Sequence, residues 1–205
     1  MTARRITVGI VDYGVGNHVS VWRAMHALGF RCRVTHDQDV LDGTDLILLP
    51  GVGAFPPAMR AIENRGLAEY LRAKARGGKP FLGICLGMQL LADASSEFGQ
   101  TAGLGLIPGQ VVPLRQAAWH IGWNTFESMG GDLLLRSIDG QSVYFNHSYV
   151  FEAPPEYCIG VARLAEPFVV AVRRDNVVGL QFHPEKSQAA GREALQRVIE
   201  GLCNA

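Results

Sequence analysis

The chain has 205 residues, 48% of them hydrophobic and 19% charged, and its 19 basic and 19 acidic side chains give a formal net charge of zero. This length and composition are typical of one soluble globular domain, which we expect to span residues 1–205. The balanced charge and the absence of a basic run argue against a nucleic-acid-binding protein. No apolar run approaches the about 20 residues that a membrane-spanning helix needs.

The four cysteines, Cys32, Cys85, Cys158 and Cys203, lie far apart in the sequence and form no Cys-x-x-Cys pair. This spacing argues against a disulfide framework and against a zinc site. The N-terminal apolar stretch ends at Asp12, and such a run is too short for a signal peptide. We therefore expect a cytoplasmic protein with reduced thiols and no metal ion, in which the cysteines other than Cys85 serve in packing.

The first half of the chain alternates expected strands with expected helices. Short apolar or β-branched runs predict strands over residues 6–11, 31–35, 45–49 and 80–84. Apolar residues at helical spacing predict helices over residues 17–28, 55–75 and 86–92. Strands and helices in alternation predict an α/β domain, built on a mainly parallel central sheet that helices flank.

The second half of the chain is richer in strands. Strand-like runs fall at residues 109–114, 142–147, 158–163, 168–173 and 177–182, and a helical pattern closes the chain at residues 187–203. The last three runs follow one another closely, as in an antiparallel meander. We therefore predict a single-domain α/β fold whose parallel sheet carries an antiparallel C-terminal extension.

The segment DYGVGN, residues 12–17, joins the first expected strand to the first expected helix. Gly14 and Gly16 supply the G-x-G of a dinucleotide-binding loop, but Val19 stands where the third glycine would be. No acidic partner for a ribose follows a second strand. A tight turn that exposes Asn17 at the carboxyl end of the strand is therefore favoured over nucleotide binding.

The segment GICLG, residues 83–87, places Cys85 between two glycines where an expected strand meets an expected helix. A nucleophile on a sharp turn needs small neighbours, because the backbones on either side approach closely. The N–H groups at the start of a helix favour a thiolate, and the N–H of Leu86 is placed to bind an oxyanion. A buried packing cysteine is the alternative, and this segment alone does not decide between the two.

The segment QFHPEKS, residues 181–187, follows an apolar strand-like run. His183 and Glu185 stand two residues apart, so at the end of a strand they can project to the same side. His183 could then accept the thiol proton while Glu185 orients the ring. A surface turn with two solvated side chains is the alternative, but this segment and the cysteine segment each supply what the other lacks.

The segment PGVG, residues 50–53, ends another expected strand, and its backbone can offer N–H donors to a substrate or an oxyanion. A plain turn is the alternative. The carboxyl ends of parallel strands share one edge of the sheet, where ligands bind. DYGVGN, PGVG, Cys85 and the His-Pro-Glu sequence all fall at such ends, which predicts an active site there with Cys85 as its nucleophile.

Together these motifs resemble those of the class I, triad-type glutamine amidotransferases, and more narrowly of the amidotransferase subunits of imidazole glycerol phosphate synthases. The resemblance covers essentially the whole chain. It is carried by DYGVGN, PGVGAF, GICLGMQLL, GWN at residues 122–124, YFNHSY at residues 144–149, and QFHPEKS. It implies the α/β fold of that family and the hydrolysis of glutamine to glutamate and ammonia for histidine biosynthesis.

The resemblance implies a role for each residue of a catalytic triad. Cys85 would attack the side-chain amide of glutamine and form a thioester, and water would then hydrolyse it. His183 would act as general base and acid, with Glu185 in support. The backbone N–H groups of Val52 and Leu86 would form the oxyanion hole.

The resemblance also implies a glutamine pocket and no cofactor. The residues that match pocket positions are Gly53, Gln89, Glu97, His147, Ser148 and Tyr149. The carboxylate of Glu97 could bind the ammonium group of the substrate by charge pairing.

A partner subunit follows from the resemblance alone. Asn17, Trp123 and Lys186 match positions that face a (β/α)₈-barrel cyclase, the second subunit of imidazole glycerol phosphate synthase, in a heterodimer. Ammonia set free in water would be protonated, so a channel across a dry interface makes chemical sense.

Three other functions remain open. The same chemistry could serve a different synthase, such as one of the vitamin B6, anthranilate or surface-sugar pathways, although GWN and YFNHSY argue against this. A cysteine hydrolase or peptidase could use the same nucleophile. A catalytically silent scaffold is the third, and the complete set of Cys85, His183 and Glu185 argues against it.

The remaining histidines are expected to be structural or solvated: His18, His26, His36 and His120. Among them His120 is the candidate exception because of its neighbours, since only Ile121 separates it from the GWN segment. Trp22 stands at helical spacing and is expected in the core.

Overall fold

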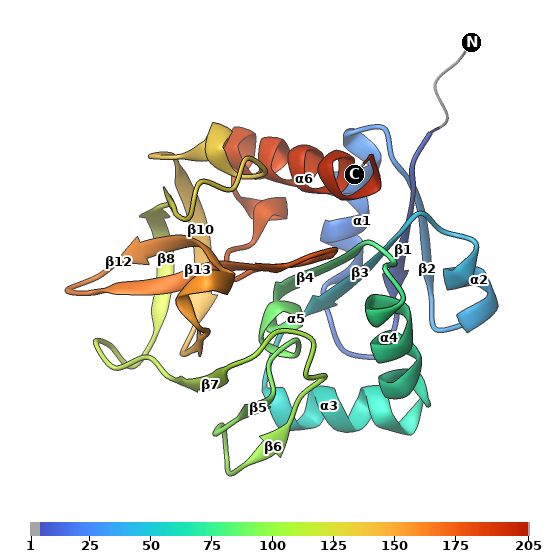
Figure 1. The fold of residues 1–205 in the computed structure, drawn as a ribbon, viewed down its shortest axis with the longest axis horizontal. Helices are drawn as coiled ribbons and strands as arrows, with labels where there is room; N and C mark the ends of the chain where they lie inside the picture. Colours follow the sequence, from blue (N-terminus) through green and yellow to red (C-terminus); the bar gives the residue numbers. More distant parts are fainter. Residues whose placement is uncertain (1–4, 205) are drawn as a thin grey trace.

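An eight-stranded mixed sheet forms the centre of the computed structural model, which describes residues 5–204 (Figure 1). The ends of the expected 1–205 domain, residues 1–4 and 205, lie outside the described residues. The strands follow the order β2 (Arg31–Thr35), β1 (Thr7–Val11), β3 (Leu46–Gly51), β4 (Phe81–Cys85), β14 (Val177–Leu180), β13 (Pro167–Arg174), β12 (Cys158–Arg163) and β9 (Glu127–Ser128).

Parallel pairing runs from β2 to β14, and antiparallel pairing from β14 to β9. The predicted meander is therefore confirmed as β12, β13 and β14. Its last strand pairs in parallel with β4, with Leu180 opposite Ile84. The prediction of a mainly parallel sheet with an antiparallel C-terminal extension is thus confirmed.

Helices cover both faces of this sheet (Figure 1). One face carries α1 (His18–Ala27) and α6 (Gln188–Cys203), and the other carries α3 (Phe55–Asn64), α4 (Leu67–Arg76) and α5 (Leu86–Gln89). Side chains alternate between the faces of a strand. In β3, Leu46 and Leu48 join the core under α1 and α6, and Ile47 and Leu49 join the core under α3 and α4. A strand buried on both faces needs the continuous apolar run seen in the sequence.

The helix predicted over residues 55–75 is wrong as a single element, because the structure divides it into α3 and α4. Gly66 adopts a left-handed conformation with φ of 65° between them. Glycine takes this conformation without the steric cost that a Cβ atom brings. The helix predicted over residues 86–92 is also shorter than expected, since the carbonyls of residues 90–92 accept hydrogen bonds from N–H groups of residues 104–107.

Helix α1 forms where the sequence predicts it, but it is rotated relative to the expectation. Val21 and Met25 are its buried residues. Trp22, expected in the core, is exposed and stacks on His26 with ring centroids 5.0 Å apart. Residues at positions i and i+4 share one face of a helix, and here Val21 and Met25 provide the face that packs on the sheet.

Several short elements have no counterpart in the predicted order. They are α2 (Gln38–Asp42), β5 (Ala94–Ser95), β6 (Thr101–Ala102), β8 (His120–Thr125), β9 and β11 (Tyr149–Glu152). Strand β8 pairs with β10 (Ser142–His147) in a separate antiparallel hairpin. Strand β11 is an edge strand of a four-stranded sheet in the order β11, β7 (Gln110–Pro113), β5 and β6. Residues 5–204 also contain three 3-10 helices: η1 (Arg136–Ile138), η2 (Pro155–Tyr157) and η3 (Pro184–Lys186).

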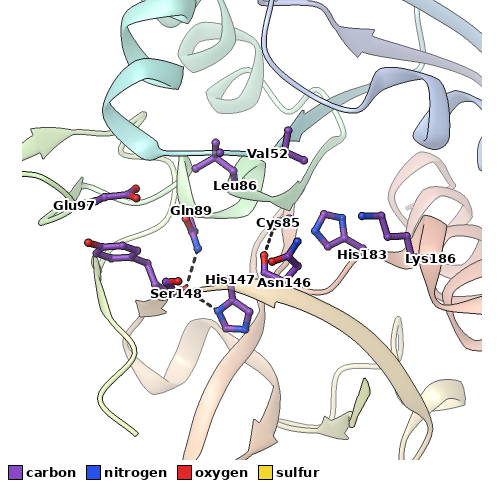
Figure 2. A pocket seen from close by; sticks show the side chains of 12 residues that line it. Val52, Cys85, Leu86, Gln89, Glu97, Asn146, His147, Ser148, His183 and Lys186 are labelled. Atoms are coloured by element: carbon purple, nitrogen blue, oxygen red, sulfur yellow. Dashed lines mark hydrogen bonds between the residues drawn. The ribbon is translucent and has the colours of Figure 1, made fainter. Parts of the chain in front are cut away.

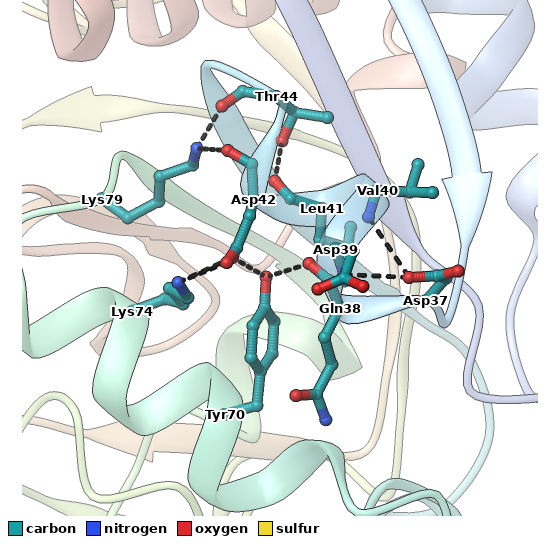
Figure 3. A network of polar contacts seen from close by, with 10 residues as sticks. All are labelled: Asp37, Gln38, Asp39, Val40, Leu41, Asp42, Thr44, Tyr70, Lys74 and Lys79. Atoms are coloured by element: carbon teal, nitrogen blue, oxygen red, sulfur yellow. Dashed lines mark hydrogen bonds and ion pairs between the residues drawn. The ribbon is translucent and has the colours of Figure 1, made fainter.

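Polar contacts join α2 to α4 (Figure 3), and Leu41 of α2 is buried in the same core cluster as Leu71 of α4. The carboxylate of Asp37 caps the helix by accepting from the N–H of Asp39 at 2.9 Å. At the other end, the Asp42 carboxylate accepts from the hydroxyl of Tyr70 at 2.7 Å and from the ammonium of Lys74 at 2.8 Å. A helix of this length is not stable by itself, so these contacts fix its position at the edge of the sheet.

None of the helices within residues 5–204 combines the length and apolar character needed to cross a lipid bilayer.

Candidate active site

The carboxyl ends of β3, β4 and β14 meet beside the end of β10, around a cavity of about 350 Å³ (Figure 2). The residues that line this cavity are Val52, Gly53, Cys85, Leu86, Gln89, Glu97, Asn146, His147, Ser148, Tyr149, His183 and Lys186. It contains every residue predicted for the oxyanion hole and the glutamine pocket, together with Cys85, His183 and Lys186. The volume is in the range of small-molecule sites.

Cys85 occupies a strained junction between β4 and α5. Its φ of 54° and ψ of −112° are unusual for a residue with a side chain, and such strain persists only where the surroundings impose it. The two flanking glycines leave the necessary room. A Cβ on Gly83 would stand 2.5 Å from the carbonyl oxygen of Gly87, and a Cβ on Gly87 would stand 1.9 Å from that of Leu49. The junction therefore packs directly against the end of β3.

His183 and Glu185 form a buried pair next to Cys85. The Nδ1 atom of His183 lies 2.8 Å from Oε1 of Glu185, and the two side chains are 3% and 1% exposed. This bond leaves Nε2 of the ring for Cys85. Burial lowers the pKa of His183, but hydrogen bonds to Cys85 and Glu185 outweigh it and raise the pKa to about 9. The ring is therefore a strong proton acceptor beside the thiol.

The pairing of β14 with β4 explains why these residues meet. Leu180 lies opposite Ile84, one position before Cys85, and His183 follows a few residues after the end of β14. Neighbouring parallel strands bring their carboxyl ends to the same edge. The 3-10 helix η3 then turns Glu185 back toward the ring.

Three residues near the sulfur were not foreseen from the sequence. The sulfur of Cys85 lies 3.8 Å from Nε2 of Gln181 and 3.9 Å from the carbonyl oxygen of Asn146. Tyr13 is fully buried and donates its hydroxyl to the carbonyl of Pro50 at 2.8 Å. Burial and the nearby Cys85 raise the pKa of Tyr13, which keeps its phenol neutral. Gln181 and Tyr13 lie within quoted motifs, so motif membership was the available signal.

Two polar side chains of the cavity are already fixed by the fold. Gln89 donates from Nε2 to the carbonyl of Tyr149 and to Oε1 of Gln181, both at 3.0 Å. Glu97 accepts from the backbone N–H of Phe55, the first residue of α3, at 2.7 Å. The carboxylate of Glu97 is thus held at the cavity wall by the N-terminus of α3.

Two of the residues expected at a partner surface, Lys186 and Trp123, lie beside Tyr144. The ammonium of Lys186 lies 5.6 Å above the ring of Tyr144, and the ring of Trp123 meets that ring edge-on at 5.9 Å. Trp123 remains 49% exposed. Asn17 lies outside the cavity lining and caps α1, accepting from the N–H of Ser20 at 3.3 Å.

The arrangement can perform nucleophilic acyl chemistry. A thiol, a proton acceptor and a carboxylate that orients the acceptor lie in sequence, which is the order of a catalytic triad. All four cysteines are free. Among residues 5–204, no group of three or more histidine, cysteine, aspartate or glutamate side chains is placed to hold a metal ion.

Curated relatives match the chain over almost its full length. The imidazole glycerol phosphate synthase subunit HisH of Lacticaseibacillus casei (strain BL23) is 44% identical over 195 residues, which cover 93% of this chain and 94% of that protein. The protein of the same description from Listeria monocytogenes serovar 1/2a is 41% identical over 191 residues, covering 91% and 92%.

Solved structures share the fold at lower identity. The structure of PurLQS from Thermotoga maritima has a TM-score of 0.77 at 18% identity, covering 97% of this chain and 100% of that one. A glutamine amidotransferase from the same organism has a TM-score of 0.72 at 15% identity, covering 98% and 100%. A sequence model of the family described as glutamine amidotransferase class-I matches residues 9–199. The chain therefore belongs to the class-I glutamine amidotransferase family, and within it to the group of HisH subunits.

Proposed function

We propose that the chain is the glutaminase subunit of an imidazole glycerol phosphate synthase. It hydrolyses glutamine to glutamate and ammonia, and the ammonia serves a cyclase subunit in histidine biosynthesis, in the cytoplasm. The observation that carries this proposal is the alignment of Cys85, His183 and Glu185 at one end of a cavity of about 350 Å³. The HisH relatives support the choice of pathway.

The first half of the reaction forms a thioester. His183 takes the proton of the Cys85 thiol, and the sulfur attacks the side-chain amide carbon of glutamine. The tetrahedral intermediate then loses its C–N bond, and His183 returns the proton to the departing ammonia. Glu185 holds the ring through Nδ1 and stabilises the imidazolium that forms between these two steps.

The second half releases glutamate. Water attacks the thioester carbon, His183 accepts a proton from this water, and the C–S bond breaks to restore the Cys85 thiol. Each half passes through a tetrahedral oxyanion. The backbone N–H groups of Val52 and Leu86 are our candidates to bind it, since both residues line the cavity and Gly51 pairs with Cys85 in the sheet register.

The opposite end of the cavity is the proposed glutamine pocket. The carboxylate of Glu97 would pair with the ammonium group of the substrate. Neighbouring polar groups would fix the rest of the substrate, and they are contributed by Gly53, Gln89, His147, Ser148 and Tyr149.

The proposed partner is a (β/α)₈-barrel cyclase that forms a heterodimer with this chain and receives ammonia through a channel. Asn17, Trp123 and Lys186 are the proposed contacts. Hairpin β8–β10 supports a docking surface in this region, because its neighbouring apolar side chains are exposed: Trp119 at 65%, Ile121 at 60% and Trp123 at 49%. Exposed apolar groups in a cluster are typical of protein interfaces.

Replacement of the nucleophile tests the proposal. Together with the cyclase subunit, Cys85→Ala is expected to abolish glutamine-dependent synthesis of imidazole glycerol phosphate and to spare synthesis from added ammonium salt. The reason is that only ammonia production needs the thiol. Cys203→Ala, which alters a half-buried cysteine at the end of α6, is the matched control and is expected to retain both activities. Loss of both activities in Cys85→Ala would instead assign Cys85 to folding or assembly.

A further inference from the structure

A chain of hydrogen bonds runs inward from hairpin β8–β10 to the cavity. In β8, Nδ2 of Asn124 lies 3.3 Å from Nε2 of His120 and donates to the carbonyl of Arg163 at 2.7 Å. Nδ1 of His120 lies 3.1 Å from Nε2 of His147. Nδ1 of His147 lies 2.9 Å from the carbonyl oxygen of Tyr149. Each histidine therefore uses both of its ring nitrogens.

The same carbonyl of Tyr149 connects this series of hydrogen bonds to the proposed nucleophile, Cys85. It also accepts from Nε2 of Gln89 at 3.0 Å, and Figure 2 shows the bonds from Gln89 and His147 converging beside Ser148. The second hydrogen of that Gln89 amide goes to Oε1 of Gln181, whose own amide lies 3.8 Å from the sulfur of Cys85. One backbone carbonyl thus anchors both walls of the proposed glutamine pocket.

The bond partners fix where the protons lie. A carbonyl oxygen can only accept, so His147 carries its proton on Nδ1 and offers Nε2 as an acceptor. His120 must then donate from Nδ1, and its own Nε2 accepts from the amide of Asn124. Burial lowers the pKa of both rings, that of His147 to about 4. Both histidines are neutral at neutral pH, as this proton arrangement requires.

His120 has no contact with the cavity. It is 7% exposed, its ring stacks on Phe145 at 4.7 Å, and it meets the edge of Phe168 at 5.4 Å. It does not line the cavity, whereas His147 does. Its influence on a substrate would therefore pass through His147 and the carbonyl of Tyr149.

We propose that His120 is a positioning residue for glutamine: its Nδ1–H holds His147 in one tautomer, and His147 in turn holds the pocket wall formed by Ser148 and Tyr149. This inference rests on the proposed glutaminase activity. Removal of the donor leaves a buried acceptor on His147 unpaired, a state that proteins avoid by moving the groups concerned. The wall that shifts belongs to the glutamine pocket. The bond between His183 and Glu185 lies outside this series of hydrogen bonds.

Two substitutions separate the donor from the ring. His120→Asn keeps an N–H donor near the position of Nδ1 but loses the aromatic ring. His120→Phe keeps an aromatic ring against Phe145 but loses the donor. With the cyclase subunit present, His120→Phe is expected to raise the KM for glutamine by roughly tenfold, with kcat within about threefold. His120→Asn is expected to stay within about twofold of the unaltered protein in both parameters.

The control is His36→Leu, at an exposed position near the edge of the sheet, which is expected to change neither parameter. Equal KM values in all variants would overturn the proposal. So would a high KM in His120→Asn with a normal KM in His120→Phe, since that result assigns the role to ring packing. A loss confined to kcat would also overturn it.

A spectroscopic measurement tests the same proposal without activity. In ¹⁵N NMR of the unaltered chain, His120 and His147 are both expected to carry the proton on Nδ1, and protonation of either ring on Nε2 would overturn the proposal. If the unaltered protein released no glutamate with its partner present, the proposed function would fail while this measurement still decided the arrangement of the two rings. Normal glutamate release with an unchanged KM in His120→Phe would refute only the inference.

Discussion

At the scale of single residues, the proton affinity of His183 is the property that most directly governs the site. Its pKa of about 9 reflects two hydrogen bonds that overcome the effect of burial. One partner is the thiol itself, and the other is a carboxylate whose second oxygen has no partner within the described residues. The carboxylate of Glu185 therefore interacts mainly with the imidazole ring of His183.

Replacement of that charge tests its role. Glu185→Gln can still accept from Nδ1 but is neutral, so we expect the pKa of His183 to fall. The alkaline limb of the kcat profile for glutamine hydrolysis should then move to lower pH, because the imidazolium that protonates departing ammonia is lost earlier. We also expect kcat at neutral pH to fall by about tenfold or more. A kinetic pH profile of both proteins measures the shift.

The exposed Glu63 of α3 supplies the control, and Glu63→Gln should leave the limb in place. An unmoved limb in Glu185→Gln would contradict this role of the charge. The same shift bears on folding. Because the folded-state pKa of His183 lies above its ordinary 6.5, the bonds stabilise the fold fully below pH 6.5, and this contribution is lost as the pH rises through about 9.

At the scale of elements, the junction of β4 and α5 depends on contact between backbones. Gly83 and Gly87 let the first turn of α5 lie directly on the ends of β3 and β4. This contact is what presents the first N–H groups of α5 beside Cys85. A side chain at either glycine would have to displace main-chain atoms, which a packed interior resists.

Gly87→Ala is therefore expected to destabilise the protein by about 3 kcal/mol or more and to abolish glutaminase activity. The new Cβ would lie 1.9 Å from the carbonyl oxygen of Leu49. Gly43→Ala is the matched control, since Gly43 has an ordinary φ of −73° and no neighbour closer than 3.6 Å. It should change stability by less than about 0.5 kcal/mol. Urea unfolding measures both effects through the midpoints, provided that the denaturant slope is the same in all proteins. Similar midpoints for Gly87→Ala and Gly43→Ala would contradict the importance of the contact between Gly87 and Leu49.

At the scale of the whole molecule, the loop after β3 is less closely packed than the end of the strand from which it leaves. Gly51 is clamped, because a Cβ there would meet Gly87 and Leu86 at 2.8 Å and the hydroxyl of Tyr13 at 2.9 Å. Gly53 has a φ of 92°, is exposed, and has no atom within 4 Å of its would-be Cβ. The proposed Val52 donor therefore lies between a residue that is closely packed and one that has open space beside it.

We accordingly expect the isolated chain to hydrolyse glutamine slowly and to be accelerated by the cyclase subunit with its ligand bound. A single oxyanion donor that turns into place is worth about 10²-fold in kcat or more. Glutamate release measured with the chain alone, with the cyclase, and with the cyclase and its ligand provides the comparison. Fast and equal glutamate release in all three conditions would contradict activation of this chain by the cyclase subunit.

The sequence predicts the sheet, and the grouping of the motifs around one cavity, because both depend on local patterns. The apolar runs of β3 and β4 and the glycines around Cys85 are consequences of burial and close backbone approach, which short segments record. The face of α1 was predicted wrongly because Trp22 and Val21 are both apolar, and only packing selects between them. Strand β8 was missed because most of its residues are at least partly exposed and it has no apolar run.

Contacts between distant segments were harder to foresee. Gln181 and Asn146 approach the sulfur only because β14 and β10 end beside β4. The bond between His120 and His147 depends on the register of β8 with β10, in which these two residues lie directly opposite. Neither histidine carries a sequence pattern that specifies its partner.

The parallel pairing of β4 with β14 has a consequence for the synthesis and folding of the protein. Strand β4 lies between β3 and β14, and β14 is the last strand along the sequence within residues 5–204. Synthesis proceeds from the N-terminus onward, and a domain generally folds as a unit. The thiol is therefore made long before its proton acceptor, and a chain that stops short of β14 carries β4 as an unpaired edge. The proposed triad of Cys85, His183 and Glu185 is complete only once β14 and the residues that follow it have been made.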